Sequence, residues 1–169
     1  MKPLDSAKNK LKEAKNCIDA MKVSKSFDKF EYNWKNYLYT IEKTWQKACH
    51  QLKRSPKFQG WPKRGKVRNL RKKDELLSYL VNSRGADKHT IKDITKRKSG
   101  GVGINSPVNV TFYPAKIVLV DVVNGGKTYL VPSKHLGRNL KNSSPIDIAE
   151  QSYKFYEEFI NEAEENFCK

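Results

Sequence analysis

Residues 27–53 constrain the fold more than any other part of the sequence. An apolar side chain recurs there at every third or fourth position, in the series Phe27, Phe30, Trp34, Leu38, Ile41, Trp45, Cys49 and Leu52. Such spacing gathers these side chains on one face of an α-helix. Tyr32, Tyr37 and Tyr39 are expected to widen that face. Ser26 can cap the helix, because its hydroxyl accepts a hydrogen bond from a backbone amide of the first turn. The pattern predicts a long amphipathic helix whose tryptophans lie in a core.

Three further apolar series at helical spacing accompany the long helix. One covers residues 4–22, and another covers residues 67–84. The last begins near Ser144, a second suitable N-cap. Pro145 follows at the first helical position, and the carboxylate of Asp147 favours the positive end of the helix. The sequence therefore predicts four helices.

The hydrophobic period changes to that of β-strands before the last helix. Branched and aromatic residues dominate VNVTFY at 108–113, KIVLVDVV at 116–123 and KTYLVP at 127–132. These residue types are enriched in strands. The Asn-Gly-Gly sequence at 124–126 favours a tight turn between the last two segments. We expect an antiparallel hairpin or a three-stranded meander.

The order of these segments predicts a mainly α fold. It is a four-helix up-and-down bundle with a small antiparallel β-hairpin or three-stranded meander inserted at about 107–133, between the third and fourth helices. We expect a single domain over residues 1–169, because no linker or repeat divides the chain. Two segments are predicted to be loops. The first half of 53–73 is rich in proline and glycine, and residues 92–106 are basic and glycine-rich.

Positive charge is concentrated in the first part of the chain. The net charge is +16, and residues 1–100 hold 27 Lys and Arg against 10 Asp and Glu, whereas residues 101–169 hold 7 against 8. The densest run, residues 53–73, has no acidic residue and contains Phe58 and Trp61. One-sided basic charge favours a polyanionic partner, and interleaved aromatic residues suit single-stranded nucleic acid. The predicted nucleic-acid-binding residues are Lys53, Arg54, Lys57, Lys63, Arg64, Lys66, Arg68, Arg71, Lys72 and Lys73.

Several other classes of protein and site are disfavoured. No run of about 18 apolar residues is present, so the sequence predicts no membrane span. Cys17, Cys49 and Cys168 are odd in number and lack metal-ligand spacing, which suits reduced thiols in the cytoplasm. His135 lies in a predicted surface loop, where it contacts solvent or a phosphate. We expect a soluble cytoplasmic protein without a metal or cofactor.

Arg84 and His89, in the segment NSRGADKH at 82–89, have side chains suited to RNA cleavage without a metal ion. Histidine exchanges protons near neutral pH, and the arginine fork matches the oxygens of a phosphate. In an uninterrupted helix, positions five apart are rotated by about 140° around the axis. The two side chains would share a pocket if Gly85 ended the helix between them.

A helical bundle with an arginine and a histidine at this spacing, at the end of a core helix, resembles the HEPN superfamily (higher eukaryotes and prokaryotes nucleotide-binding). Many members are metal-independent ribonucleases of toxin–antitoxin and phage-defence systems. The resemblance implies that Arg84 stabilises phosphate charge and that His89 is the general acid and base. It also implies a homodimer with the site at the seam between two copies. A polar residue commonly follows the arginine, and Gly85 stands in its place, as a helix break or as the mark of an inactive site.

Two functions from different classes are compatible with these features. The first is an RNA-binding endoribonuclease of toxin or phage-defence type, with RNA as substrate and a possible protein partner such as an antitoxin. The alternative is a non-catalytic module that binds nucleic acid or another protein within a larger complex. Cleavage that survives removal of metal ions and depends on Arg84 and His89 distinguishes the first from the second.

Overall fold

The structure is a computed structural model that describes residues 4–89, 95–98, 101–105, 109–113 and 116–168. Side chains are described for residues 4–86 and 117–168. Within these ranges the chain is mainly helical, as the sequence predicts. The helices are α1 (Asp5–Lys22), α2 (Phe27–Gln51), α3 (Pro56–Gln59), α4 (Pro62–Lys73), α5 (Glu75–His89) and α6 (Pro145–Phe167).

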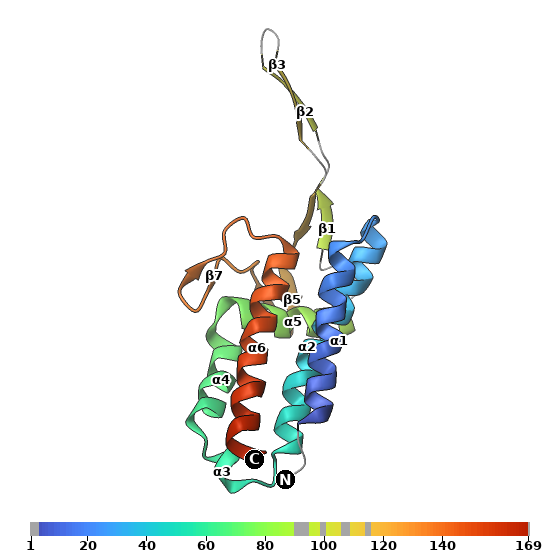
Figure 1. The fold of residues 1–169 in the computed structure, drawn as a ribbon. Coiled ribbons are helices and arrows are strands. Elements are labelled where there is room, and N and C mark those ends of the chain that lie inside the picture. The colour runs from blue at the N-terminus through green and yellow to red at the C-terminus, as the bar shows by residue number, and fades with distance from the viewer. Residues whose placement is uncertain (1–3, 90–94, 99–100, 106–108, 114–115, 169) are drawn as a thin grey trace.

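The three longest helices lie side by side. α1 packs along α2, and α6 contacts both of them, while α5 packs on α2 and α4 (Figure 1). The two predicted caps are confirmed. The Ser26 hydroxyl accepts a hydrogen bond from the amide of Lys29, and Ser144 forms a capping box with Asp147. These caps satisfy amides that a helix start leaves without partners, and so they fix where α2 and α6 begin.

Two clusters of buried apolar side chains hold the helices together. The larger cluster contains Trp34 and Tyr37 of α2, both fully buried, with the apolar faces of α1, α5 and α6. The smaller cluster lies around Phe58 and Phe159, near the chain termini, and Trp45 packs against both clusters. The prediction that the α2 tryptophans belong to the core is confirmed.

The predicted apolar face of α2 is too wide. Tyr37 is buried, and its hydroxyl contacts the Ala149 carbonyl and the Ser152 hydroxyl at 2.8 and 2.6 Å. Tyr32 and Tyr39 are instead 67% and 47% exposed. At about 100° per residue, both lie on the side of α2 opposite its buried residues, where an amphipathic side chain can stay in contact with solvent.

The segment between α2 and α5 differs most from the prediction. A loop was expected up to residue 66, followed by one helix over 67–84, but α3 and α4 occupy the loop region and the helix is interrupted at Asp74. Pro56 and Pro62 each stand at the start of a helix, where a missing amide costs no hydrogen bond. Asp74 is extended, with ψ of 131°, so the chain changes direction there.

Two carboxylates at this junction hold a distant loop. Asp74 accepts hydrogen bonds from the amides of Leu77 and Leu136, at 3.1 and 2.8 Å. Glu75 accepts from the amides of Ser133 and Lys134 and from the Ser133 hydroxyl, at 2.9 to 3.0 Å. The start of α5 is therefore anchored to residues 133–136.

The β region consists of antiparallel two-stranded pieces. β1 (Thr95–Lys98) pairs with β4 (Lys116–Leu119), and β2 (Gly101–Asn105) pairs with β3 (Asn109–Tyr113), which together form an arm that extends from one end of the helices (Figure 1). The remaining pairs are β5 (Val122–Asn124) with β6 (Lys127–Tyr129), and β7 (Lys134–His135) with β8 (Arg138–Asn139). The hairpin expectation is confirmed, and the three-stranded meander is wrong for the described strands.

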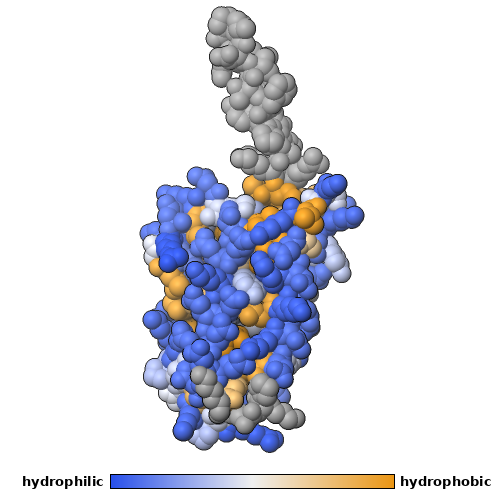
Figure 2. Space-filling view, viewed as in Figure 1, coloured by the Kyte–Doolittle hydropathy of each residue, from blue (hydrophilic) through white to orange (hydrophobic). Residues whose placement is uncertain are grey.

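The strands also extend further along the chain than 107–133. β1 and β2 occupy most of the segment 92–106 that was predicted to be a loop, and its remaining residues lie outside the described part of the chain. The glycine-rich β2 pairs with β3, whose branched residues favour a strand. The tight turn at 124–126 is confirmed, with positive φ at Gly125 and Gly126. Apolar side chains gather on the surface directly below the arm (Figure 2).

Candidate nucleic-acid interface

The segment that carries Arg84 lies in the second half of α5, which runs without interruption from Glu75 to His89. The helix break that was considered at Gly85 is therefore wrong. At about 100° per residue, positions 84 and 89 of this helix face sides about 140° apart. The side chain of His89 lies outside the described residues, whereas that of Arg84 is described and half-buried.

A close approach between α5 and the β5–β6 hairpin explains Gly85. A β-carbon at position 85 would lie 2.6 Å from the side-chain nitrogen of Asn124 and 3.1 Å from its amide carbon. The same nitrogen donates a hydrogen bond of 3.0 Å to the side-chain oxygen of Asn82. The Asn124 amide thus fills the space that a side chain at position 85 would need.

Arg84 contacts an aromatic side chain rather than a carboxylate. Its guanidinium carbon lies over the ring of Tyr39, 5.8 Å from the ring centre, and the Lys43 ammonium lies 5.6 Å from the same centre. A cation near an aromatic face is attracted by the ring quadrupole. Within the described part of the chain, the structure pairs neither cation with an acidic side chain. Two cations are therefore positioned around one half-exposed tyrosine.

A shallow groove continues from Tyr39 along α2, between that helix and α1. Its lining from α2 is Tyr39, Lys43, Gln46, Lys47, His50 and Gln51, and α1 contributes Ser6 and Lys10. These α2 residues recur at three- to four-residue steps, so they share one face of the helix. No lining residue of this groove is acidic. This groove was not among the predicted sites, although the spacing of Tyr39, Lys43, Lys47 and His50 is a detectable signal in the sequence.

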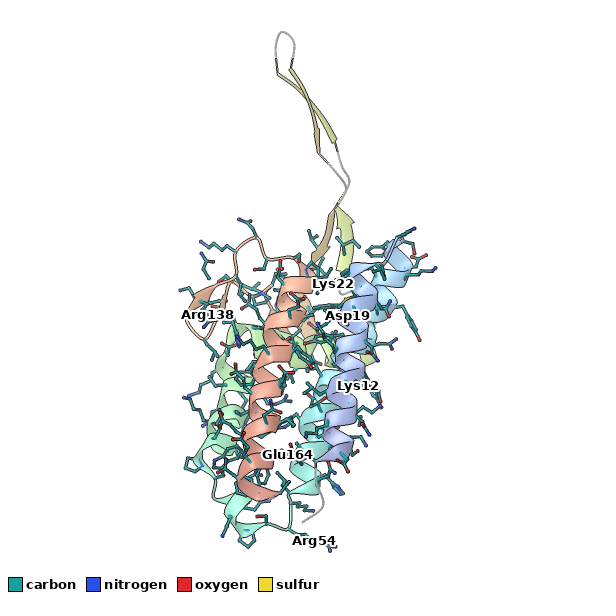
Figure 3. The ribbon with its side chains drawn as sticks, in the orientation of Figure 1. Lys12, Asp19, Lys22, Arg54, Arg138 and Glu164 are labelled. Atoms are coloured by element: carbon teal, nitrogen blue, oxygen red, sulfur yellow. The ribbon has the colours of Figure 1, made fainter. Side chains whose placement is uncertain are left out.

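Some basic residues of 53–73 are exposed to solvent, whereas others contact side chains of the protein. Lys63 forms an ion pair with Glu162 of α6, and the Arg64 guanidinium lies 5.3 Å from the ring centre of Phe58. Seven others are exposed on and around α3 and α4, and Arg54 projects at the end of the molecule (Figure 3). They are Lys53, Arg54, Lys57, Lys66, Arg68, Lys72 and Lys73. These seven are accessible to a polyanion.

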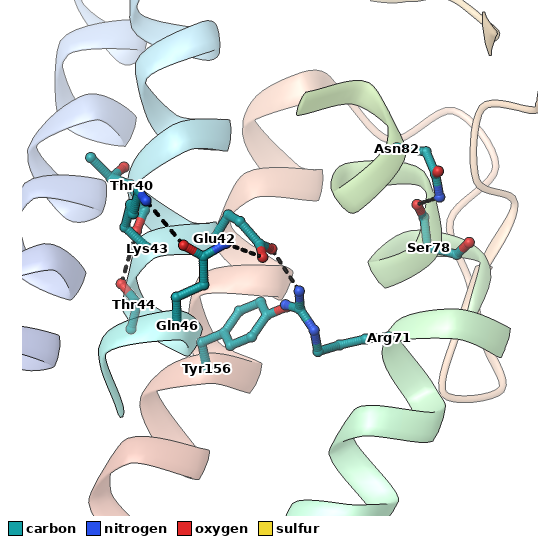
Figure 4. A network of polar contacts seen from close by, with 9 residues as sticks. All are labelled: Thr40, Glu42, Lys43, Thr44, Gln46, Arg71, Ser78, Asn82 and Tyr156. Atoms are coloured by element: carbon teal, nitrogen blue, oxygen red, sulfur yellow. Dashed lines mark hydrogen bonds and ion pairs between the residues drawn. The ribbon is translucent and has the colours of Figure 1, made fainter. Parts of the chain in front are cut away.

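Arg71 is the exception among the predicted nucleic-acid-binding residues, because its side chain is almost fully enclosed by neighbouring helices. Its guanidinium pairs with the Glu42 carboxylate at 2.6 Å, with side-chain exposures of 10% and 11%, and also contacts the Tyr156 hydroxyl (Figure 4). The guanidinium also lies 5.0 Å from the ring centre of Trp45. A charged pair this far from water holds α2, α4 and α6 together. Its assignment to the nucleic-acid interface is therefore wrong.

The hydroxyl of Tyr156 stays neutral in this cluster. Burial raises the pKa of Tyr156 to about 12, partly offset by the charge of Arg71. The carboxylate of Glu42 also accepts a hydrogen bond of 3.0 Å from Gln46, which itself accepts one from Lys43 (Figure 4). The polar network therefore links the buried pair to the rim of the groove.

His135 is a structural residue in this molecule. The sequence placed it in a surface loop, but it is 5% exposed and its Nδ1 lies 2.8 Å from Asp74. Burial acts to raise the pKa of Asp74, and the hydrogen bonds from His135, Leu136 and Leu77 outweigh it, so this pKa lies below its ordinary value. The His135 ring also packs edge-on against Phe155. It is not available to a phosphate.

The described residues contain no group of three or more His, Cys, Asp or Glu side chains that could hold a metal ion. The cysteines, all within the described ranges, form no disulfide. Burial raises the thiol pKa of Cys17 and of Cys49, which makes both weak nucleophiles at neutral pH.

None of the helices, as far as they are described, has the length and apolar content needed to cross a membrane. Comparison of the chain with protein-family models, with curated proteins and with solved structures found no match.

Proposed function

We propose that this protein is an RNA-binding member of the HEPN type, with a four-helix up-and-down bundle formed by α1, α2, α6 and the α4–α5 pair. Its activity is metal-independent RNA cleavage, with Arg84 stabilising the charge of the phosphate and His89 moving protons. The observation that carries the proposal is the placement of Arg84, half-exposed beside Tyr39 and unpaired with any described carboxylate.

An arginine without an acidic partner is suited to an anion. A guanidinium offers a planar fork of donors that matches phosphate oxygens, and an adjacent aromatic ring restricts its motion without neutralising it. Lys43 at the same tyrosine, the other lysines of the groove and those of α3 and α4 supply the positive field that attracts a polyanion. Both features favour nucleic acid over a small neutral ligand.

Gly85 is compatible with this function. The HEPN resemblance leads us to expect a polar side chain directly after the arginine, and the Asn124 amide lies where such a side chain would begin. Asn124 comes from a different element, and it is held by its hydrogen bond to Asn82. A polar group therefore occupies the space at position 85 despite the glycine.

The helical geometry favours a site that needs a second copy of the chain. Because α5 is continuous, positions 84 and 89 face sides about 140° apart. An RNA strand that contacts both would have to cross the helix, or a second copy would supply one of the two groups. The homodimer that the HEPN resemblance implies fits the second arrangement.

The test is cleavage of a fluorescently labelled RNA in the presence of EDTA. We expect the purified protein to cleave, and Arg84→Ala and His89→Ala each to reduce the rate at least about a hundredfold, since charge stabilisation and proton transfer typically contribute that much. Arg138→Ala is the matched control, because Arg138 is exposed on β8 and does not line the groove. Unchanged cleavage by the Arg84→Ala/His89→Ala double variant would refute the catalytic assignment.

A non-catalytic RNA-binding module is the second candidate. It is favoured by the angular separation of positions 84 and 89 in one helix, which leaves a single chain without a shared pocket. This function predicts salt-sensitive RNA binding with no cleavage products. A dimer that binds RNA but does not cleave it under any salt condition would select this candidate over the first.

A further inference from the structure

We infer that the groove between α1 and α2 is the path of a single RNA strand, which runs from Arg84 past Tyr39 and Lys43 toward the end of α2. This inference rests on the proposed RNA binding and not on cleavage. It names the substrate as single-stranded, and it assigns binding to residues outside the basic run 53–73.

Two lysines of the groove have no acidic partner among the described residues. The Lys43 ammonium donates to the side-chain oxygen of Gln46 at 3.0 Å, and the Lys47 ammonium donates to the Ser6 hydroxyl at 2.8 Å. Both partners are neutral, so the hydrogen bonds orient the lysines and leave their charges available. Lys10, at the rim, is instead paired with Glu13 at 2.5 Å. The charge of the groove therefore resides mainly on Lys43 and Lys47.

An aromatic ring, that of Tyr39, lies at one end of the groove. Proteins that bind single strands combine a cationic channel with exposed aromatic side chains. Tyr39 is 47% exposed, and its ring holds both Arg84 and Lys43 within 5.8 Å of its centre. The ring thus positions two phosphate-binding cations next to each other and offers an apolar edge to a base.

The groove leads along α2 toward further basic residues. From Tyr39 to His50 the groove follows α2 for about 16 Å at 1.5 Å per residue. The exposed residues Lys53 and Arg54 follow directly beyond the end of α2. A strand in the groove would therefore reach the basic surface of α3 and α4 without crossing an acidic region of the groove.

The experiment measures binding of a fluorescein-labelled, unstructured 12-nucleotide RNA by anisotropy. The test variant is Lys43→Gln/Lys47→Gln. The matched control is Lys12→Gln/Lys154→Gln, which removes the same charge from exposed positions that do not line the groove. We expect the test variant to weaken binding roughly tenfold and the control at most about twofold. The slope of log K against log salt should fall by about 1.4 in magnitude in the test variant, at about 0.7 per phosphate contact.

Tyr39 supplies a second comparison within the same assay. Tyr39→Phe keeps the ring and should bind within about twofold of the original protein, whereas Tyr39→Leu removes the ring and should weaken binding about fivefold. Thermal unfolding midpoints show whether each variant is folded. RNA binding in the groove is expected to depend on the ring of Tyr39 and not on its hydroxyl.

The outcomes separate this inference from the proposed function. If the test and control variants weaken binding equally while the original protein binds RNA, the groove assignment is wrong and the RNA-binding function stands. If the original protein binds no RNA at about 0.1 M salt, both are wrong. Tighter binding of a duplex with the same number of phosphates would overturn the assignment to a single strand.

Discussion

At Gly85, α5 and the β5–β6 hairpin come closer than a side chain would permit. The sequence offered two meanings for this glycine, a helix break or a missing polar residue, because both depend only on neighbours in the chain. The space at position 85 is instead occupied by Asn124, which lies 39 positions away in the sequence. Contacts at that separation leave no local signal, so the role of Gly85 was not predictable.

The contact predicts how Gly85 responds to substitution. Alanine in a helix is ordinarily about 1 kcal/mol more stable than glycine. Here we expect Gly85→Ala to give no gain or a loss of up to about 1 kcal/mol, because Asn124 must move and its hydrogen bond to Asn82 is lost. In an Asn124→Ala background, Gly85→Ala should stabilise by about 1 kcal/mol.

Urea unfolding of the four proteins at pH 7 measures this double-mutant cycle. A coupling free energy of at least about 1 kcal/mol supports the close approach of α5 and β5. An equal stabilisation by alanine in both backgrounds would contradict it.

At the scale of elements, the apolar periodicity found α1, α2 and α6 but merged α4 with α5. The helical spacing of leucines continues on both sides of Asp74, so periodicity alone gives no reason to stop there. Asp74 accepts a hydrogen bond from Leu77, three residues on, which is the pattern of an N-cap. Its other partners, His135 and Leu136, are distant in sequence and could not be anticipated.

The Asp74 contacts predict a pH dependence of stability. The folded-state pKa of Asp74 lies below its ordinary value of 3.8, and that of Glu75 lies below 4.5. The two carboxylates therefore stabilise the fold fully at any pH above their ordinary pKa values. This stabilisation is lost as the pH falls from the ordinary pKa values through the lowered ones. Asp74→Asn should cost about 1–2 kcal/mol at pH 7, because a charged acceptor of several hydrogen bonds is removed.

The free energies of unfolding at pH 7 and pH 2.5 check this prediction. The difference between the original protein and Asp74→Asn should shrink at the lower pH, where Asp74 also becomes neutral. Asp19→Asn, at an exposed position on α1, serves as the control (Figure 3). A difference that stays constant with pH would show that the Asp74 charge is not responsible.

At the scale of the whole molecule, some basic residues form ion pairs within the fold and others remain accessible to solvent. The acidic side chains of α6 pair with lysines of α1 and α4, such as Glu150 with Lys22 at 2.5 Å and Glu162 with Lys63. The Arg71 side chain is enclosed beside Glu42, while the groove lysines are partly exposed and four lysines of α3 and α4 are exposed, namely Lys57, Lys66, Lys72 and Lys73. Composition predicted the excess of charge, but only the packing shows which residues carry it on the surface.

We propose that this basic surface binds RNA through phosphate contacts. The most direct measurement is the affinity of the original protein for a single-stranded RNA between 0.05 and 0.3 M KCl, at about neutral pH. We predict a linear fall of log K with log salt, with a slope of about −3 or steeper, since the groove and the α3–α4 surface together provide at least about four contacts. A slope near zero, or no binding at about 0.1 M KCl, would contradict the account.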